Sequence, residues 1–200
     1  LTAFYKLIKN PISRIEVASA GGYLSYENIA DKATVAGVEV EVRKNLFVRP
    51  LSSAANGMNK LSFGLNGSYI YTNAKMPLAT VTTGSQLEGA APWIANFDLY
   101  HNFTKGNHSF INTLVLNYVS DKIYTIGTQG YQDIMEQGMM TLDFVSQAKL
   151  NKYVSLTLKA RNLLNPSYKL SRKANESGEK VVLSDYKKGI NISLGVSCTF

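Results

Sequence analysis

The stretch Ile190-Asn-Ile-Ser-Leu-Gly-Val-Ser-Cys-Thr-Phe200 decides the fold, because apolar and polar residues alternate along it without interruption. A period of two residues is that of a β-strand whose faces meet different surroundings. The alternation recurs in seven further windows and predicts an all-β, antiparallel meander of about eight strands. The windows are residues 1–8, 35–43, 61–71, 93–103, 109–119, 140–150, 153–163 and 190–200. In window 109–119 apolar residues occupy both phases, so a strand is predicted there without a phase.

The composition narrows the class of protein. Charged residues make up 18% of the 200 residues, below the roughly 25% of an average soluble domain. The formal net charge is +7, and the one cysteine, Cys198, excludes an internal disulfide framework. Apolar runs fall short of the about 18 residues that a membrane-spanning helix needs, which excludes a helical membrane protein. Because the chain starts at Leu1 without a signal peptide, we expect a piece of a longer protein.

Strand lengths and connections predict a transmembrane β-barrel wall. The windows run about 9 to 11 residues, enough to cross a bilayer when tilted, whereas globular strands favour about 5 or 6. Long and short connections also alternate, as the outer loops and periplasmic turns of outer-membrane barrels do, which puts the C-terminus on the periplasmic side. The long connections are residues 9–34, 72–92, 120–139 and 164–189, the short ones are 104–108 and 151–152, and 44–60 is intermediate.

Formal charges in the windows of clear phase fall on the polar phase. A charge that faces hydrocarbon costs about 2 to 4 kcal/mol at mid-bilayer, so this placement is expected of a barrel with lipid outside. A soluble sandwich or lipocalin-like barrel would also keep charges off its core and remains an alternative. The predicted lumen-facing charges are Glu39, Glu41, Arg43, Asp98, Asp143, Lys159 and Arg161.

Three motifs resemble segments of TonB-dependent outer-membrane receptors. Residues 26–41 resemble the segment "N-x-x-x-x-A-x-x-x-G-V-E-x-E" of that family and follow a strand like the one at residues 2–5. Residues 161–168, Arg-Asn-Leu-Leu-Asn-Pro-Ser-Tyr, are similar to the family's "N-L-x-N-x-x-Y" near the end of its next-to-last strand. The last strand is similar to the one that the barrel-assembly machinery reads, with Gly195 and Phe200 as the assembly signal. Residues 185–196 resemble receptors of the Bacteroidetes type.

The resemblance implies a bacterial outer-membrane importer. Residues 1–200 would be the C-terminal part of a barrel of about 22 strands, a fragment without the plug domain and the remaining strands. The imported solute would be large and scarce, such as a ferric siderophore, cobalamin or a glycan. The expected partners are outer-membrane lipid and lipopolysaccharide, the barrel-assembly machinery, and the TonB complex through the missing plug only.

Candidate ligand residues lie in the long connections. The connection after Tyr168 is net basic and could attract anionic ligands, or the phosphates of lipopolysaccharide, by screened electrostatics. An ordinary solvated loop is the simpler interpretation. The candidates are Tyr124, Tyr131, Lys169, Arg172 and Lys173.

No enzyme, cofactor or metal is expected. Neither His101 nor His108 lies beside a lumenal Ser and Asp as a catalytic triad requires. Glu39 and Glu41 share a strand face, but two solvated charges offset by Arg43 explain them better than a paired-carboxylate site. Metal-ligand spacing and a phosphate-binding glycine loop are missing from the sequence. Basic residues are not interleaved with stacking aromatics, so nucleic acid is not an expected partner.

A self-contained eight-stranded outer-membrane barrel with a structural or adhesion role is the alternative function, since eight strands suffice to close a small barrel. Its lumen would need closely packed, complementary charges. The polar phase here instead carries many small groups, such as Ser62, Gly64 and Ser155, which suits a wall that faces a wide lumen.

Overall fold

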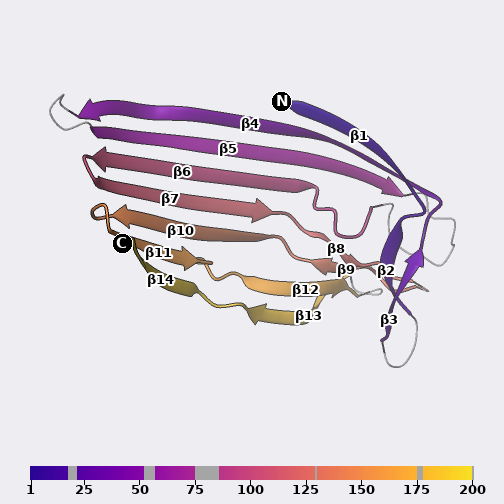
Figure 1. Ribbon diagram of the computed structural model, residues 1–200. Coiled ribbons are helices and arrows are strands. Elements are labelled where there is room, and N and C mark those ends of the chain that lie inside the picture. The colour runs from indigo at the N-terminus through magenta and orange to yellow at the C-terminus, as the bar shows by residue number, and fades with distance from the viewer. Residues whose placement is uncertain (18–21, 52–56, 75–85, 129, 175–177, 200) are drawn as a thin grey trace.

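One antiparallel sheet of eight long strands dominates the computed structural model, which describes residues 1–17, 22–51, 57–74, 86–128, 130–174 and 178–199. Each of these strands pairs with the next one along the chain, and they lie side by side in Figure 1. They are β1 (Thr2–Lys9), β4 (Lys32–Leu51), β5 (Gly57–Ala74), β6 (Trp93–Lys105), β7 (His108–Val119), β10 (Met139–Lys149), β11 (Val154–Arg161) and β14 (Asn191–Cys198). The predicted all-β meander is confirmed. Among the described residues, no helix has the length and apolarity to cross a membrane.

The register of the sheet sorts the side chains onto an apolar and a polar face. Leu65 lies opposite Phe97, and Phe97 lies opposite Leu116. In the adjacent row Gly64 lies opposite Asp98. Since residues that face each other across strands share a face and alternate along each strand, the predicted phases are confirmed. The apolar face is not covered: Leu65 is 48% exposed and Leu194 is 72% exposed.

Pairing also settles the phase of β7. Leu114 lies opposite Leu99 and Phe144, whereas Val115 lies opposite Asp98 and Asp143. The apolar face of β7 therefore carries Phe110, Leu114, Leu116 and Tyr118, and its polar face carries Ile111, Val115 and Val119.

Strands β4 and β5 are longer than predicted, with 20 and 18 residues. They pair as far as Leu51 and Gly57, so most of the connection expected at residues 44–60 is strand. A bulge between Asn45 and Phe47 shifts the register by one residue and interrupts the alternation, which is why the sequence pattern ended early. β1 pairs with β4 only as far as Glu39.

Three hairpins in the long connections lie at one end of the sheet, and we call them together the cap (Figure 1). Its strands were not predicted: β2 (Ile12–Glu16), β3 (Leu24–Asn28), β8 (Lys122–Thr125), β9 (Ile134–Glu136), β12 (Ser167–Lys173) and β13 (Lys180–Lys187). β13, β12, β9 and β8 form one sheet, and β2 pairs with β3. A hydrophobic core joins the β2–β3 and β8–β9 hairpins and consists of Ile15, Ile29, Ile123 and Ile126, with Met135 packed against it.

Short turns occupy the opposite end, together with the last described residues of the chain (Figure 1). Between β6 and β7 the turn is Gly106-Asn107. Between β10 and β11 the Asn151 side chain accepts hydrogen bonds from the backbone N–H groups of Tyr153 at 2.8 Å and Val154 at 2.9 Å. The predicted alternation of long loops and short turns, with the C-terminus on the turn side, is confirmed.

Candidate functional site

Packing explains the glycine in the motif at residues 26–41. Gly37 of β4 lies opposite Phe4 of β1. A Cβ atom at residue 37 would collide with the Phe4 ring, so glycine leaves the space that this ring occupies.

The motif at residues 161–168 turns the chain from β11 into the cap. Asn162 and Asn165 both have positive φ, 58° and 44°. Asn162 donates from its backbone N–H to Asp143 Oδ1 at 2.8 Å and from Nδ2 to the carbonyl of Gly189 at 2.7 Å. Asn165 Oδ1 accepts the N–H of Gly189 at 3.0 Å. The two asparagines thus tie the outgoing chain to the returning one.

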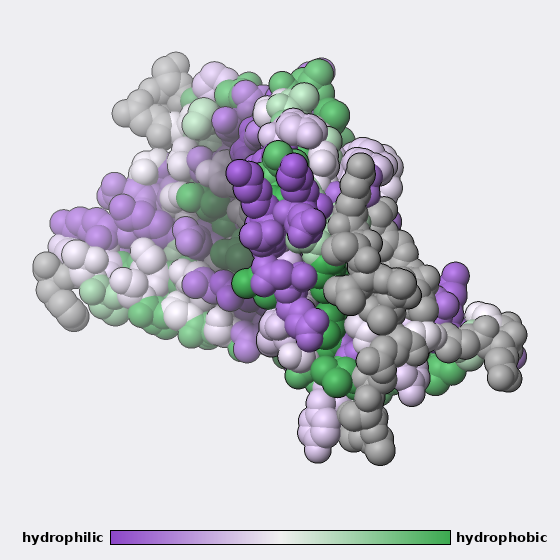
Figure 2. All heavy atoms as spheres, turned by 90° about the vertical axis from the view of Figure 1, so that its right-hand side faces the viewer, coloured by the Kyte–Doolittle hydropathy of each residue, from purple (hydrophilic) through white to green (hydrophobic). Residues whose placement is uncertain are grey.

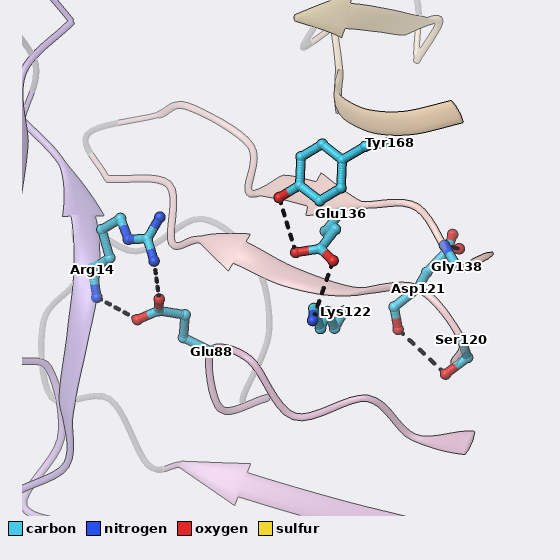
Figure 3. Close-up of polar contacts among 8 residues, drawn as sticks. All are labelled: Arg14, Glu88, Ser120, Asp121, Lys122, Glu136, Gly138 and Tyr168. Carbon is cyan, nitrogen blue, oxygen red and sulfur yellow. Dashed lines mark hydrogen bonds and ion pairs between the residues drawn. The ribbon is translucent and has the colours of Figure 1, made fainter. Parts of the chain in front are cut away.

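Arg14 of β2 is held between a carboxylate and an aromatic ring. Its guanidinium lies 3.2 Å from Glu88 Oε1 (Figure 3). It also lies 4.2 Å from the centroid of the Tyr124 ring. Burial acts to lower the pKa of Arg14, but Tyr124, Glu88 and Tyr26 outweigh it and raise the pKa above its ordinary value. Tyr124, a predicted ligand residue, therefore helps to fix the β2–β3 hairpin.

Glu136 of β9 joins two hairpins of the cap. Its carboxylate lies 3.2 Å from Lys122 Nζ and accepts a hydrogen bond from the Tyr168 hydroxyl, also at 3.2 Å (Figure 3). Burial, together with the charge and hydrogen bond of Glu136, raises the pKa of Tyr168 to about 12. The hydroxyl therefore keeps its proton and acts as a donor at neutral pH.

Arg172 of β12 crosses to the β2–β3 hairpin. Its guanidinium forms an ion pair with Glu16 and lies 5.3 Å from the centroid of Tyr131. The Thr128 hydroxyl donates to the carbonyl of Glu16 at 2.5 Å. Two further predicted ligand residues, Arg172 and Tyr131, therefore take part in contacts that hold the cap together.

A cavity of about 300 Å³ opens beside these contacts in the cap. Lys173 and Lys180 lie directly opposite each other in the β12–β13 register, and within the described residues neither forms an ion pair. Asp121 and Asp133 already accept backbone hydrogen bonds at 2.6 Å and 2.8 Å. The lining residues are Asp121, Gln132, Asp133, Met135, Ser171, Arg172, Lys173 and Lys180. Figure 2 shows hydrophilic side chains gathered in the middle of this end of the molecule.

The structure brings two of the five predicted ligand residues to this cavity, Arg172 and Lys173. Lys169 instead forms an ion pair with Asp185 at 3.1 Å, and its hydrogen bond is the main cause that lowers the pKa of Asp185. Lys180 belongs to the same basic connection as Arg172 and Lys173, and it faces Lys173 across the β12–β13 hairpin. Sequence reasoning missed Asp121 and Asp133, which come from the connection before β10 and lie at the cavity because β9 pairs with β12.

All seven charges predicted to face the lumen lie on the polar face of the sheet. Arg43 Nε lies 2.5 Å from Glu41 Oε1, and a Cβ at Gly64 would collide with the Asp98 carboxylate. Arg43 and Asp98 border a hollow of about 580 Å³, and Asp143 and Arg161 border another of about 370 Å³. Glu39 lies opposite Ser68, and Lys159 lies opposite Ser193.

The predicted assembly signal is described only in part. Gly195 of β14 lies opposite Thr157, on the sheet edge, and Phe200 lies outside the described residues. Within the described ranges, His, Cys, Asp and Glu form no group of three or more that could hold a metal ion.

An antiparallel meander with an apolar outer face, loop hairpins at one end and tight turns at the other is the wall of an outer-membrane β-barrel. The model of the family described as TonB dependent receptor-like, beta-barrel, matches residues 1–163. The chain therefore belongs to the TonB-dependent receptor β-barrel family, a family of outer-membrane transporters rather than enzymes. Comparison with curated proteins and with solved structures gave no significant match.

Proposed function

We propose that this chain is the C-terminal wall of the barrel of an active importer, and that its cap helps to bind the incoming solute at the outer mouth. The polar face of the sheet would line the lumen, and the cap would lie outside the cell. Family membership supports the transport role, and the alternation of long loops and short turns supports the orientation.

The observation that carries the binding role is the pair Lys173 and Lys180. Like charges directly opposite each other on neighbouring strands destabilise a sheet. Four other cations of the cap have carboxylate partners, among them Arg14 with Glu88 and Arg172 with Glu16. An unpaired pair of ammonium groups at the cavity favours a solute that carries an anionic or strongly polar group.

Ferric siderophores, cobalamin and glycans are the solute classes that we propose, and anionic siderophores fit the two lysines best. Energy would come from the TonB complex through a plug outside these residues. Lipopolysaccharide around the cap, assembly machinery that reads the last strand, and a Bacteroidetes source are parts of the same proposal. The closed eight-stranded alternative receives no support from the pairing, since β1 and β14 do not pair within the described residues.

Growth of a strain that lacks the gene tests the proposal. The strain is grown on a panel of media. In each medium either the only iron source is one ferric siderophore, the only carbon source is one glycan, or growth requires added cobalamin. We expect the strain to fail on one of these media. Complementation with the full-length gene should restore growth. The double variant Lys173→Gln, Lys180→Gln should need about tenfold more solute for half-maximal uptake, the loss of one charge-assisted hydrogen bond.

The matched control is Lys187→Gln, which removes a lysine from β13 away from the cavity. We expect normal uptake from this variant. Growth of the deletion strain on every medium would contradict the import role, whereas normal uptake by the double variant would contradict only the role of the two lysines.

A further inference from the structure

A chain of hydrogen-bonded polar side chains crosses the apolar face of the sheet. His101, Asn112 and Ser146 occupy consecutive positions of one row on β6, β7 and β10, with Leu61 next to His101 and Leu158 next to Ser146. The residues above them in the next row are apolar. These polar side chains therefore lie on the face that meets lipid.

The direction of the hydrogen bonds follows from the donors. Ser146 Oγ donates to Asn112 Oδ1 at 2.7 Å, and Asn112 Nδ2 lies 3.4 Å from His101 Nδ1. Because an amide nitrogen only donates, His101 Nδ1 is the acceptor and its ring proton is on Nε2. His101 Nε2 then donates to Asn59 Oδ1 at 3.0 Å. Within the described residues, the N–H groups of the Asn59 carboxamide have no acceptor.

These hydrogen-bonded side chains lie near the periplasmic edge of the membrane. Trp93 and Phe103 both lie on the apolar face of β6, ten residues apart. At about 3.3 Å per residue and a tilt of about 40°, they are about 25 Å apart along the membrane normal, the height of an apolar band. Phe103 packs against Phe110, with ring centroids 6.3 Å apart, at the turn end. His101 is two residues further in, about 5 Å, the depth of lipid ester groups rather than of the bilayer centre.

An arginine lies next to these hydrogen-bonded side chains. Arg49 of β4 lies directly opposite Asn59, beyond the bulge, and its guanidinium lies over the Phe47 ring at 5.5 Å. Arg49 is exposed and forms no ion pair within the described part of the chain. A guanidinium binds phosphate with two parallel hydrogen bonds, a geometry that a lipid headgroup at this depth can meet.

We propose that Arg49, Asn59, His101, Asn112 and Ser146 form a binding site for one anionic diacyl phospholipid of the periplasmic leaflet. Arg49 binds the phosphate, and the amide N–H groups of Asn59 and Asn112 donate to the ester carbonyls. His101 and Ser146 hold the two amides in place. The acyl chains then lie along the apolar face above the row. The N–H groups of Asn59 and the second N–H of Asn112 would otherwise lack partners at the edge of the hydrocarbon, where an unpaired polar group is costly.

Native mass spectrometry of the full-length protein tests this site. The protein is purified in a mild detergent, delipidated and titrated with phosphatidylglycerol. We expect one tightly bound lipid, and a half-saturating concentration about tenfold higher for Arg49→Gln and for Asn112→Leu. The Arg49→Gln change should leave the binding of diacylglycerol, which has no phosphate, unaltered. Glycerol phosphate, which has no acyl chains, should not bind.

The matched controls lie on the polar face. Asn96→Leu removes a similar side-chain hydrogen bond, from Asn96 Nδ2 to Asn66 Oδ1 at 3.3 Å, and Arg161→Gln removes an arginine. Both should keep the lipid. Equal lipid binding by Arg49→Gln and the original protein would overturn the proposal, and so would equal loss in the controls. A heat-dependent shift in gel mobility identifies the variants that fold. If a site variant does not fold, Ser146→Ala is tested in its place, because it removes the hydrogen bond to Asn112 and leaves an apolar side chain on the strand.

Discussion

Replacement of Asn162 should separate the two roles of the asparagine at the end of β11. Its φ of 58° lies in the left-handed region, which costs an alanine about 1 to 2 kcal/mol and glycine almost nothing. Its side chain also donates to the carbonyl of Gly189 at 2.7 Å, a hydrogen bond with a net value of about 1 kcal/mol. Asn162→Ala should therefore destabilise the junction by about 2 to 3 kcal/mol, and Asn162→Gly by about 1 kcal/mol.

Amide hydrogen exchange of the full-length protein in detergent measures this local effect, because the junction opens without unfolding the barrel. Exchange of the Gly189 amide should become about 30- to 150-fold faster in Asn162→Ala and about fivefold faster in Asn162→Gly. Amides in the middle of β6 provide the internal reference and should not change. Equal rates in the two variants would refute the argument, since they would mean that the backbone conformation carries no cost.

Three further predictions test the pH response, the packing and the membrane face. The pKa of Tyr168 is raised to about 12, so its hydrogen bond stabilises the cap fully below the ordinary tyrosine pKa of about 10 and is lost as the pH rises toward 12. Proteolysis of the cap should therefore become faster as the pH rises toward 12. The variant Tyr168→Phe should not show this increase. Gly64→Ala should lower the thermal midpoint in detergent because its Cβ meets a carboxylate, whereas Gly67→Ala should not, since nothing lies within 4 Å of its Cβ. Leu65→Arg should cost about 2 to 4 kcal/mol in folding into lipid vesicles, against almost nothing for Asn66→Arg, and equal costs would contradict the assignment of faces.

The alternation of apolar and polar residues predicted the barrel strands because each face meets a single environment along its length. The alternation did not predict the strand correctly where a face does not meet a single environment or where the register shifts. A bulge beyond Asn45 shifted the phase of β4, so the pattern ended although the strand continued. In β7, valines such as Val115 occupy the polar face beside aspartates, where a small apolar side chain is tolerated between charged neighbours. Only the pairing with β6 and β10 separates the two phases.

The cap was not predicted because its strands are short and pair across distant connections. Strand β9 has three residues, too few to show a period, and its partner β12 lies in the next long connection. Basic residues could be recognised from the sequence, but their partners could not. Arg172 meets Glu16 from the other end of the chain, and Lys173 meets Lys180 across a hairpin. Sequence therefore located the charges, and the fold determined which of them are neutralised.

Unpaired cations are more informative about function than the total charge of this chain. Of the arginines and lysines in the cap, Arg14, Lys122, Lys169 and Arg172 have carboxylate partners and act as structural ties. Lys173 and Lys180 at the cap cavity, and Arg49 on the lipid face, lack such partners within the described residues, and each lies where a molecule from outside the chain can reach it. Folding gains nothing from like charges placed opposite each other or from an arginine beside hydrocarbon. Their placement is therefore explained by the two proposed binding roles, of a solute at the outer end and of a phospholipid at the inner one.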